Sequence, residues 1–392
     1  MLVGIVGAPN KGKSTIFSAL TLNEVAIADY PFTTINPNLG VAYATKECIE
    51  KSLSVKCKAR NSLCINGTRM LPVNVIDVAG LVEGAHAGKG MGNQFLNDLA
   101  SSEALLLVVD ASGKTDSNGN SCDDCNPAND VRIVTNELLE WLTSIIKRHV
   151  NTISKRKDGV NALGEVLAGL KVTKEQIKTA IDSCFLTDSN INWSDSDIKK
   201  FSSYLIEKTK PILIVANKSD LKNSEQNIKQ LKTEYAGSNV IECSGAIELA
   251  LRKAAKQKII DYTPGSREFN LIKKDISDDQ SRALEFMLNF VRSKGTNVQQ
   301  VINKTIFELL DNIVVYPVED ENKYTDHFGN VLPDAILIKR GSTAVHLASA
   351  IHTDLAQNML YAVDAKTKRR LGKDYILKDN DVIKIVSTAK QK

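Results

Sequence analysis

The chain begins with residues 1–20, MLVGIVGAPNKGKSTIFSAL, and this stretch decides the fold. Residues 7–14, GAPNKGKS, match the phosphate-loop pattern G-x-x-x-x-G-K-[ST]. The apolar run before the loop predicts a buried parallel strand, and residues 15–20 continue as a helix. Because a helix N-terminus offers free N–H groups and the positive end of its dipole, we expect a phosphate site in an α/β fold.

Each residue of this loop has a distinct expected role. Gly12 lets the backbone approach phosphate closely, since a Cβ atom would obstruct it. Lys13 would neutralise the β- and γ-phosphates and take part in catalysis, and the Ser14 hydroxyl would ligate Mg²⁺. The other residues that we assign to the nucleotide here are Asn10, Lys11 and Thr15.

Length and composition indicate a globular protein of two or three domains. The chain has 392 residues, of which 43% are hydrophobic and 24% charged. The formal net charge of +4 permits an RNA partner without requiring one. No apolar stretch is long enough to span a bilayer, and the first strand carries the phosphate loop rather than a signal peptide. We therefore expect a cytoplasmic protein with no membrane partner.

Seven cysteines, an odd number, do not form the framework of a disulfide-rich secreted domain. Cys57 with Cys64, and Cys122 with Cys125, would serve as metal ligands or as redox pairs if they met in space. We expect free thiols in two surface insertions, and leave the metal site and the pairs as alternatives.

A second motif follows the predicted strand of residues 71–77. Asp77 and Gly80 form D-x-x-G at the end of this strand. The Asp77 carboxylate would hold Mg²⁺ through water, and the Gly80 N–H would contact the γ-phosphate. The loop of residues 21–38 carries Thr33 and Thr34 just after the phosphate site, where a nucleotide-sensing switch would lie.

A third motif, N-K-x-D, follows the predicted strand of residues 211–217. The Asp220 carboxylate would accept hydrogen bonds from N1–H and the 2-amino group of guanine, whereas adenine lacks this donor pair. Asn217 would brace the base loop, and the Lys218 stem would cover the ring. Farther on, the backbone of Ser244, Gly245 and Ala246 would meet guanine O6. These loops share the carboxyl edge of one parallel sheet, where open α/β folds bind ligands.

The remaining chain alternates between helical and strand patterns. Residues 39–45, 104–110 and 240–246 predict strands, with 104–110 at the sheet centre, and a helix is expected from residue 95 to 100. The polar stretch 111–129 marks a boundary, and helical spacing dominates from about 131 to 206. Two helices are expected at 278–292 and 298–311, followed by a small α+β module with strands at 313–317, 335–338 and 382–387 and a helix at 343–354. The basic run of residues 366–370 is predicted in a turn between strands, either contacting RNA phosphate or simply solvated.

Together, these motifs resemble those of the YchF-type GTPases of the Obg group, in particular the archaeal branch with a C-terminal TGS domain. The likeness covers nearly the whole chain, through the following stretches: GAPNKGKST, YPFTTINPN, DVAGLVEGAHAGKGMGNQFL, NKSD, YTPGSREF and VYPVEDENKYTDHFGNVLPDAILIKRGST.

The resemblance implies a Ras-like P-loop domain with a helical insertion and a ubiquitin-like TGS domain. It places the nucleotide domain at 1–115 and 208–275, the insertion at 116–207, a helical connector at 276–311 and the TGS domain at 312–392. It also implies binding to ribosomes or RNA in translation. Thr34 resembles the switch threonine that reaches Mg²⁺ and the γ-phosphate, with Thr33 in place of the usual cysteine. We expect a monomer.

The base motif favours GTP binding, whereas the residue at the catalytic position predicts slow hydrolysis. Many relatives have a degenerate base motif and prefer ATP, but N-K-S-D is intact here, which favours GTP. Leu81 stands where Ras-like enzymes have the glutamine that orients water, so hydrolysis is expected to be slow or to use another group, with His86 the nearest candidate. Asn10 resembles a residue that helps place K⁺ in potassium-activated relatives. A nucleotide-gated RNA adaptor with negligible hydrolysis and an ATPase remain alternatives.

Overall fold

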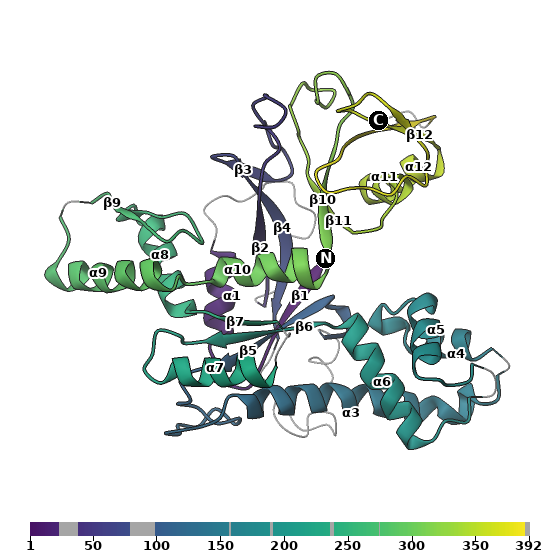
Figure 1. Cartoon of the computed structure of the whole chain (residues 1–392), viewed down its shortest axis with the longest axis horizontal. Coiled ribbons are helices and arrows are strands. Elements are labelled where there is room, and N and C mark those ends of the chain that lie inside the picture. The colour runs from purple at the N-terminus through teal and green to yellow at the C-terminus, as the bar shows by residue number, and fades with distance from the viewer. Residues whose placement is uncertain are drawn as a thin grey trace. The chain divides into compact units, whose positions relative to one another are not determined.

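The computed structural model describes residues 1–22, 38–78, 99–156, 158–188, 191–235, 239–273 and 275–388. The chain divides into two compact units, and Figure 1 shows the elements of both. Among the described residues, the first unit consists of 1–22, 38–41 and the part from 74 to 301, and the second of 42–73 and the part from 302 to 388.

Residues 2–242 contain one largely parallel sheet. The strands lie in the order β2-β4-β1-β5-β6-β7, and the short β3 pairs antiparallel with β4. Each neighbouring pair from β4 to β7 is parallel. The strands are β1 (Leu2–Val6), β2 (Leu39–Glu47), β3 (Leu63–Ile65), β4 (Thr68–Asp77), β5 (Ala104–Asp110), β6 (Ile212–Asn217) and β7 (Val240–Glu242).

The position of β5 explains its sequence. All seven of its residues are buried, because parallel strands inside an α/β sheet are covered on both faces. The strands expected at residues 2–6, 39–45, 71–77, 104–110 and 211–217 are all confirmed. Since β1, β4, β5 and β6 run parallel, the loops that follow them emerge at the same edge of the sheet.

Helices alternate with these strands, form the insertion and follow β7. They are α1 (Lys13–Thr21), α3 (Ala128–Ile153), α4 (Gly159–Val166), α5 (Lys174–Ser183), α6 (Asp195–Thr209), α7 (Ser224–Glu234), α8 (Gly245–Lys256), α9 (Asp278–Ser293) and α10 (Val298–Lys304), with a short 3₁₀ turn at Ala168–Leu170. The α3 to α6 group confirms the expected helical insertion, and Figure 1 shows it as one bundle. Capping boxes at Thr173 and Ser194 begin α5 and α6, so the residues next to each helix start determine where that helix begins.

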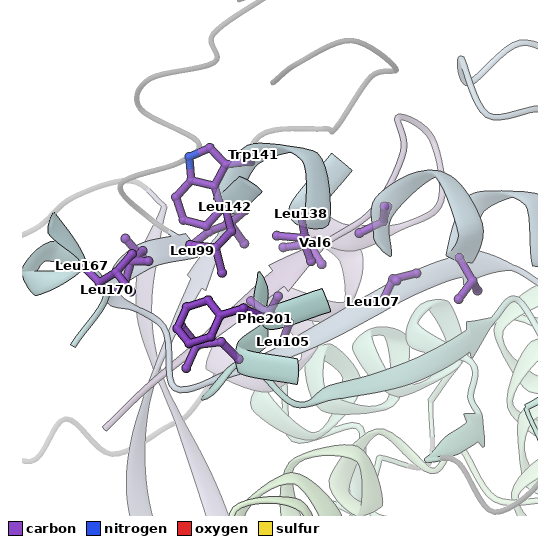
Figure 2. Packing of buried hydrophobic residues seen from close by; sticks show 14 of the residues in the cluster. Val6, Leu99, Leu105, Leu107, Leu138, Trp141, Leu142, Leu167, Leu170 and Phe201 are labelled. Atoms are coloured by element: carbon purple, nitrogen blue, oxygen red, sulfur yellow. The ribbon is translucent and has the colours of Figure 1, made fainter. Parts of the chain in front are cut away.

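One apolar cluster joins the sheet to the helical bundle. Figure 2 shows Leu105 and Leu107 of β5 together with Leu138 and Trp141 of α3, and Phe201 of α6. All of these side chains are buried. The insertion is therefore packed on the sheet through a continuous core within the first unit.

The second unit contains a small α+β module. Its sheet has the order β11-β10-β14-β12-β13, and α11 packs against it over a separate apolar cluster. The elements are β10 (Asn312–Pro317), β11 (Ile336–Lys339), α11 (Ala344–Ile351), α12 (Thr353–Gln357), β12 (Met359–Asp364), β13 (Arg370–Leu371) and β14 (Val382–Ser387), preceded by a π-helical turn at Thr305–Leu309. This confirms the expected module. Residues 366–369 of the basic run lie in the turn between β12 and β13, and Arg370 is the first residue of β13.

Some elements differ from the sequence prediction. The helix expected at 298–311 ends at Lys304 and continues as the π-helical turn, and the strand expected at 240–246 ends at Glu242 because residues 245–246 already belong to α8. The β3–β4 hairpin, α7 and the β8–β9 pair (Ile260–Asp261, Asn270–Leu271) were not predicted. Of the helix expected from Phe95, only residues from 99 onward are described, and these are helical to 101. No helix in the described ranges is both long and apolar enough to cross a bilayer.

Replacing Phe201 with alanine is expected to lower the free energy of unfolding of the first unit by about 3–5 kcal/mol, because it opens a cavity in a closed core. Both tryptophans of the chain belong to this cluster, and the Trp193 ring lies 4.9 Å from that of Phe201. Urea-induced unfolding followed by tryptophan fluorescence therefore reports on this core. Phe185→Ala is the matched control: that side chain is 91% exposed, and a change within about 0.5 kcal/mol is expected. Equal losses from both variants would contradict the assigned core.

Candidate functional site

The phosphate-loop motif lies between β1 and α1 in a conformation that requires glycine at two positions. Gly7 has φ +146° and Gly12 has φ +92°. A Cβ atom on Gly7 would lie 2.4 Å from the Val108 carbonyl oxygen, and one on Gly12 would lie 2.3 Å from Asn217 Nδ2. Both glycines are thus needed for the loop to pass close to β5 and to the base motif.

Lys13 is the first residue of α1 and is buried beneath the loop. Its Nζ donates to the Ala8 carbonyl oxygen at 2.9 Å, so the side chain curls back along the loop. Burial lowers the pKa of the Lys13 ammonium, Asp77 opposes this and Lys11 adds to it. A buried ammonium on a curled loop is well prepared for an anionic ligand, since phosphate would supply the charge partner that the protein only partly provides.

Ser14 and Asp77 meet at the loop. The Ser14 hydroxyl donates to Asp77 Oδ2 at 2.7 Å, although 63 residues separate the two in sequence. The other oxygen, Asp77 Oδ1, is buried and has no hydrogen-bond partner among the described residues. Hard oxygen ligands and an unsatisfied carboxylate oxygen suit Mg²⁺, so these two residues fit the expected ion.

Asn217, at the end of β6, connects two loops of the site. Its Nδ2 donates to the Lys11 carbonyl oxygen at 2.9 Å, and its Oδ1 accepts from the Gly245 N–H at 3.0 Å. The side chain is buried. The phosphate loop and the start of α8 are thereby fixed at a set separation, which is the bracing role expected of this residue.

Asp220 and Ser244 form the next contact. The Ser244 hydroxyl donates to Asp220 Oδ1 at 2.6 Å and also accepts from the Ile247 N–H, capping α8. This arrangement orients the carboxylate while leaving its second oxygen for a ligand. Gly245 and Ala246 follow in the first turn of α8, where backbone N–H groups lack intrahelical partners.

Sequence reasoning missed Asp110, the last residue of β5. Lys218 Nζ donates to Asp110 Oδ2 at 2.7 Å and to the Asn10 carbonyl oxygen at 3.0 Å, so the lysine links the base motif to the phosphate loop. Burial on its own raises the pKa of Asp110, but hydrogen bonds from Lys218, Ser112 and Thr115 outweigh it and hold the pKa below its usual value. Asp110 therefore stays ionised and fixes the Lys218 stem.

The polar segment after β5, expected only as a boundary, is folded against the phosphate loop. Asn10 Nδ2 donates to the Gly119 carbonyl oxygen at 2.9 Å. Lys11 is 1% exposed, and its Nζ contacts Asp130 Oδ2 and the Thr115 carbonyl oxygen, each at 2.8 Å. The Asn10 and Lys11 side chains thus hold the phosphate loop against the segment that follows β5.

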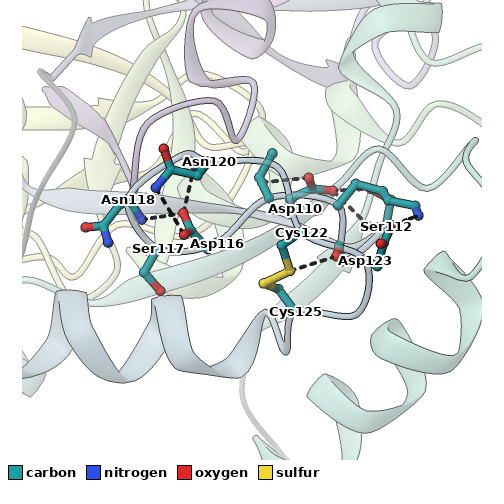
Figure 3. Close-up of a disulfide and its surroundings, with 12 residues drawn as sticks. Asp110, Ser112, Asp116, Ser117, Asn118, Asn120, Cys122, Asp123 and Cys125 are labelled. Carbon is teal, nitrogen blue, oxygen red and sulfur yellow. Dashed lines mark hydrogen bonds and ion pairs between the residues drawn. A yellow bond between two sulfur atoms is a disulfide. The ribbon is translucent and has the colours of Figure 1, made fainter.

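The same segment corrects the prediction about cysteines. Cys122 and Cys125 are joined by a disulfide, so the expectation of free thiols at these positions is wrong. Figure 3 shows the disulfide beside Asp110 and the turn around Asp116. Cys57 and Cys64 are free thiols, as expected.

A buried polar network anchors the loop that carries Ser244. Glu248 on α8 is fully buried and accepts hydrogen bonds from Arg252, Tyr262 and Thr296. The Ser244 N–H in turn donates to the Thr296 carbonyl oxygen at 3.0 Å. The only signal for Glu248 in the sequence is its i, i+4 spacing to Arg252, which exposed helix faces share.

Four residues of interest lie outside the described residues, so the structure gives them no position. They are Thr34, Gly80, Leu81 and His86. Thr15 is described and lies in the first turn of α1, beside Ser14. The structure therefore brings together the phosphate-loop residues, Asp77, the base motif and the 244–246 loop.

Comparison with known proteins identifies the domains. Three family models match the chain. The model described as "50S ribosome-binding GTPase" matches residues 2–154, and the model of the G4 motif-containing domain of YGR210-like Obg-like GTPases matches residues 215–320. The TGS domain model matches residues 328–387. An uncharacterized GTP-binding protein of Methanocaldococcus jannaschii is 48% identical over 99% of this chain and 100% of its own length. A ribosome-binding ATPase YchF of Mycoplasma genitalium is 29% identical over 97% of both chains.

A solved structure shows the same architecture. The crystal structure of a GTP-binding protein from Pyrococcus horikoshii superposes with a TM-score of 0.81 at 37% identity, covering 99% of this chain and 100% of the other. The expected Ras-like P-loop fold with a TGS domain is confirmed. The chain belongs to the YchF-type, Obg-like family of P-loop GTPases with a C-terminal TGS domain.

Proposed function

We propose that this protein binds GTP with Mg²⁺, hydrolyses it slowly to GDP and phosphate, and acts as a ribosome- or RNA-associated switch in translation. The observation that carries the proposal is the Asp220 carboxylate, oriented by Ser244 and linked through Asn217 to the phosphate loop. One rigid edge of the sheet would thus read the base and hold the phosphates together.

Asp220 supports guanine as the base. The Ser244 hydroxyl already donates to Asp220 Oδ1, so a ligand that pairs with this carboxylate must itself donate hydrogen bonds. Guanine offers N1–H and the 2-amino group, whereas adenine would leave the carboxylate desolvated and unpaired. Two hydrogen bonds to a charged group correspond to a preference of roughly 100-fold or more.

Lys13, Ser14 and Asp77 support the phosphate and metal roles. The ammonium of Lys13 would leave the Ala8 carbonyl oxygen for the β- and γ-phosphates, while the Asp77 and Ser14 oxygens would hold Mg²⁺ directly or through water. The metal would neutralise charge on the phosphates. We keep Thr34 as a further Mg²⁺ ligand and Gly80 as a γ-phosphate contact on the strength of the motifs.

Slow hydrolysis follows from Leu81, because a leucine cannot orient the attacking water. His86 is the candidate for that task. K⁺ is a further candidate cofactor through Asn10, although the Asn10 side chain already donates to Gly119 and would need to release it to contact an ion. The rival function is a nucleotide-gated RNA adaptor with negligible hydrolysis.

The ribosome role is supported by relatives and by one surface. The Mycoplasma genitalium relative is named a ribosome-binding ATPase, and the family matched by the first 154 residues is described as ribosome-binding. In the TGS domain, the turn between β12 and β13 and the first residue of β13 carry four exposed basic residues, Lys366, Lys368, Arg369 and Arg370. We place the protein in the cytoplasm as a monomer.

The first test concerns the base. Asp220→Asn is expected to weaken GTP binding about 100-fold and to improve binding of xanthosine triphosphate, whose 2-oxo group accepts a hydrogen bond from the asparagine amide. Competition against a fluorescent nucleotide measures both affinities. Asp123→Asn, an exposed carboxylate in the same unit, is the control and should leave both affinities unchanged. If Asp220→Asn keeps the guanine preference, the base assignment is wrong.

The second test separates a switch enzyme from an adaptor. Single-turnover release of γ-phosphate is expected to be slow for the protein alone and faster with ribosomes, and Mg²⁺ removal should abolish it. The same assay with K⁺ replaced by Na⁺ tests the Asn10 role. His86→Ala should lower the rate about 100-fold or more if His86 orients water, with nucleotide affinity unchanged. No phosphate release under any of these conditions would favour the adaptor.

The third test concerns the basic turn. Replacing its four basic residues with glutamine is expected to lower RNA affinity and to reduce the salt slope by roughly 0.7 for each lost phosphate contact. Lys366 and Lys368 also bond to backbone carbonyl groups within the TGS domain, so Arg369→Gln alone is the milder variant. Lys253→Gln with Lys256→Gln on α8 removes two positive charges elsewhere on the surface and controls for half of the change in net charge. Binding that stays equal to wild type would leave the turn as a solvated hairpin tip.

A further inference from the structure

Three cysteines and one glutamate, none of which belongs to a motif used above, converge in the second unit. The ligand atoms of Cys48, Glu50, Cys57 and Cys64 all lie within 4.8 Å of one another. None of the three cysteines is in a disulfide. We propose that these four side chains form a structural Zn²⁺ site.

Two local structures bring the ligands together. Cys48 directly follows β2, and its N–H donates to the Gly67 carbonyl oxygen at 2.8 Å. A compact turn then carries Glu50 and closes with a hydrogen bond from the Val55 N–H to the Glu50 carbonyl oxygen. Cys64 lies in β3, whose tight turn through Asn66 and Gly67, both with positive φ, fixes its register against β4. The site therefore depends on backbone that is already ordered.

The spacing suits zinc without large movement. Zinc–sulfur bonds of about 2.3 Å in a tetrahedron place sulfur atoms about 3.8 Å apart. Contraction of a cluster that spans at most 4.8 Å to that distance takes shifts of less than about 1 Å per atom. Three thiolates and a carboxylate complete four-coordination, which is the usual number for a structural zinc site. Soft thiolate ligands exclude Mg²⁺ and Ca²⁺ as the preferred ion.

Glu50 is held in position for this role. One of its oxygens, Oε2, accepts from the Cys57 N–H at 2.8 Å, which orients the carboxylate and leaves Oε1 for the metal. Outer hydrogen bonds of this kind orient metal ligands in zinc proteins. The same bond ties the Cys57 backbone to the turn that carries Glu50.

Arg69 supplies the charge that such a site requires. Zn²⁺ with three thiolates and one carboxylate has a net charge of −2, which is costly to bury without a cation nearby. The Arg69 side chain is 0% exposed, and its Nη1 donates to Cys57 Sγ at 2.7 Å. Its Nη2 donates to the Leu332 carbonyl oxygen at 2.8 Å, and the guanidinium lies over the Tyr316 ring. A buried guanidinium against sulfur is explained if that sulfur is an ionised metal ligand.

The metal would stabilise a specific contact within the second unit. Just past Cys57, the Lys58 and Arg60 N–H groups donate to the Val331 and Pro333 carbonyl oxygens at 2.9 and 2.7 Å. Zinc would hold the loop that makes these bonds. Its role would be structural, and it depends neither on nucleotide binding nor on hydrolysis.

The test is metal analysis of the full-length protein purified under reducing conditions. We expect about one zinc per chain by mass spectrometry, and Co²⁺ in its place should give the absorption bands of tetrahedral cobalt thiolate. Cys57→Ser and Cys64→Ser should lose the metal, and Glu50→Gln should weaken zinc affinity about tenfold or more. Cys184→Ser and Cys243→Ser, at free buried cysteines of the first unit, are matched controls that should retain it.

Measurements on the wild-type protein can test the zinc site even if a cysteine variant does not fold. A zinc chelator should lower the unfolding temperature of the wild-type chain and expose three additional reactive thiols. The proposal fails if the reduced wild type retains no zinc after incubation with Zn²⁺ and shows no cobalt thiolate bands. It also fails if Cys57→Ser binds zinc as tightly as wild type, or if two of the three cysteines form a disulfide under reducing conditions.

Discussion

The candidate site depends on two hydrogen bonds made by the Asn217 carboxamide. It hydrogen-bonds at once to the Lys11 carbonyl oxygen and to the Gly245 N–H, and it is buried, so losing it would leave both backbone groups unpaired. These groups belong to the loop after β1 and to the start of α8. Because β5 lies between β1 and β6 in the sheet, no ladder hydrogen bond joins the loops directly. The Asn217 side chain, together with Lys218, therefore holds the phosphate-loop motif close to the N-K-x-D motif and the start of α8.

A second layer of charge supports the same loops. Lys11 pairs with Asp130, and Lys218 pairs with Asp110, each within a largely closed environment. Buried pairs of this kind add little net stability, but removing one partner is expensive, so they favour a single arrangement. The loop would then bind phosphate without first being ordered, which is how preorganised sites gain affinity.

Local patterns in the sequence were sufficient for the sheet and for the motif residues, because each motif directly follows a buried strand. They were insufficient for Asp110, Asp130 and the segment that supports the phosphate loop. The Lys11 to Asp130 contact spans more than 100 residues, and no sequence pattern near either residue predicts it. The sequence offered Cys57 and Cys64 as possible metal ligands, but Cys48 and Glu50 were missed for a related reason. They reach the other two only through a turn and a hairpin, although Asn66-Gly67 was a readable hairpin signal.

The central claim is that this edge of the sheet selects guanine nucleotides. The most direct measurement is competition of GTP and ATP for the wild-type protein against a fluorescent guanine nucleotide, with Mg²⁺ present. Because the Asp220 carboxylate is oriented by Ser244 and would pair with donors that guanine offers and adenine lacks, GTP should bind about 100-fold more tightly than ATP, or better. Equal affinities for GTP and ATP would contradict the account.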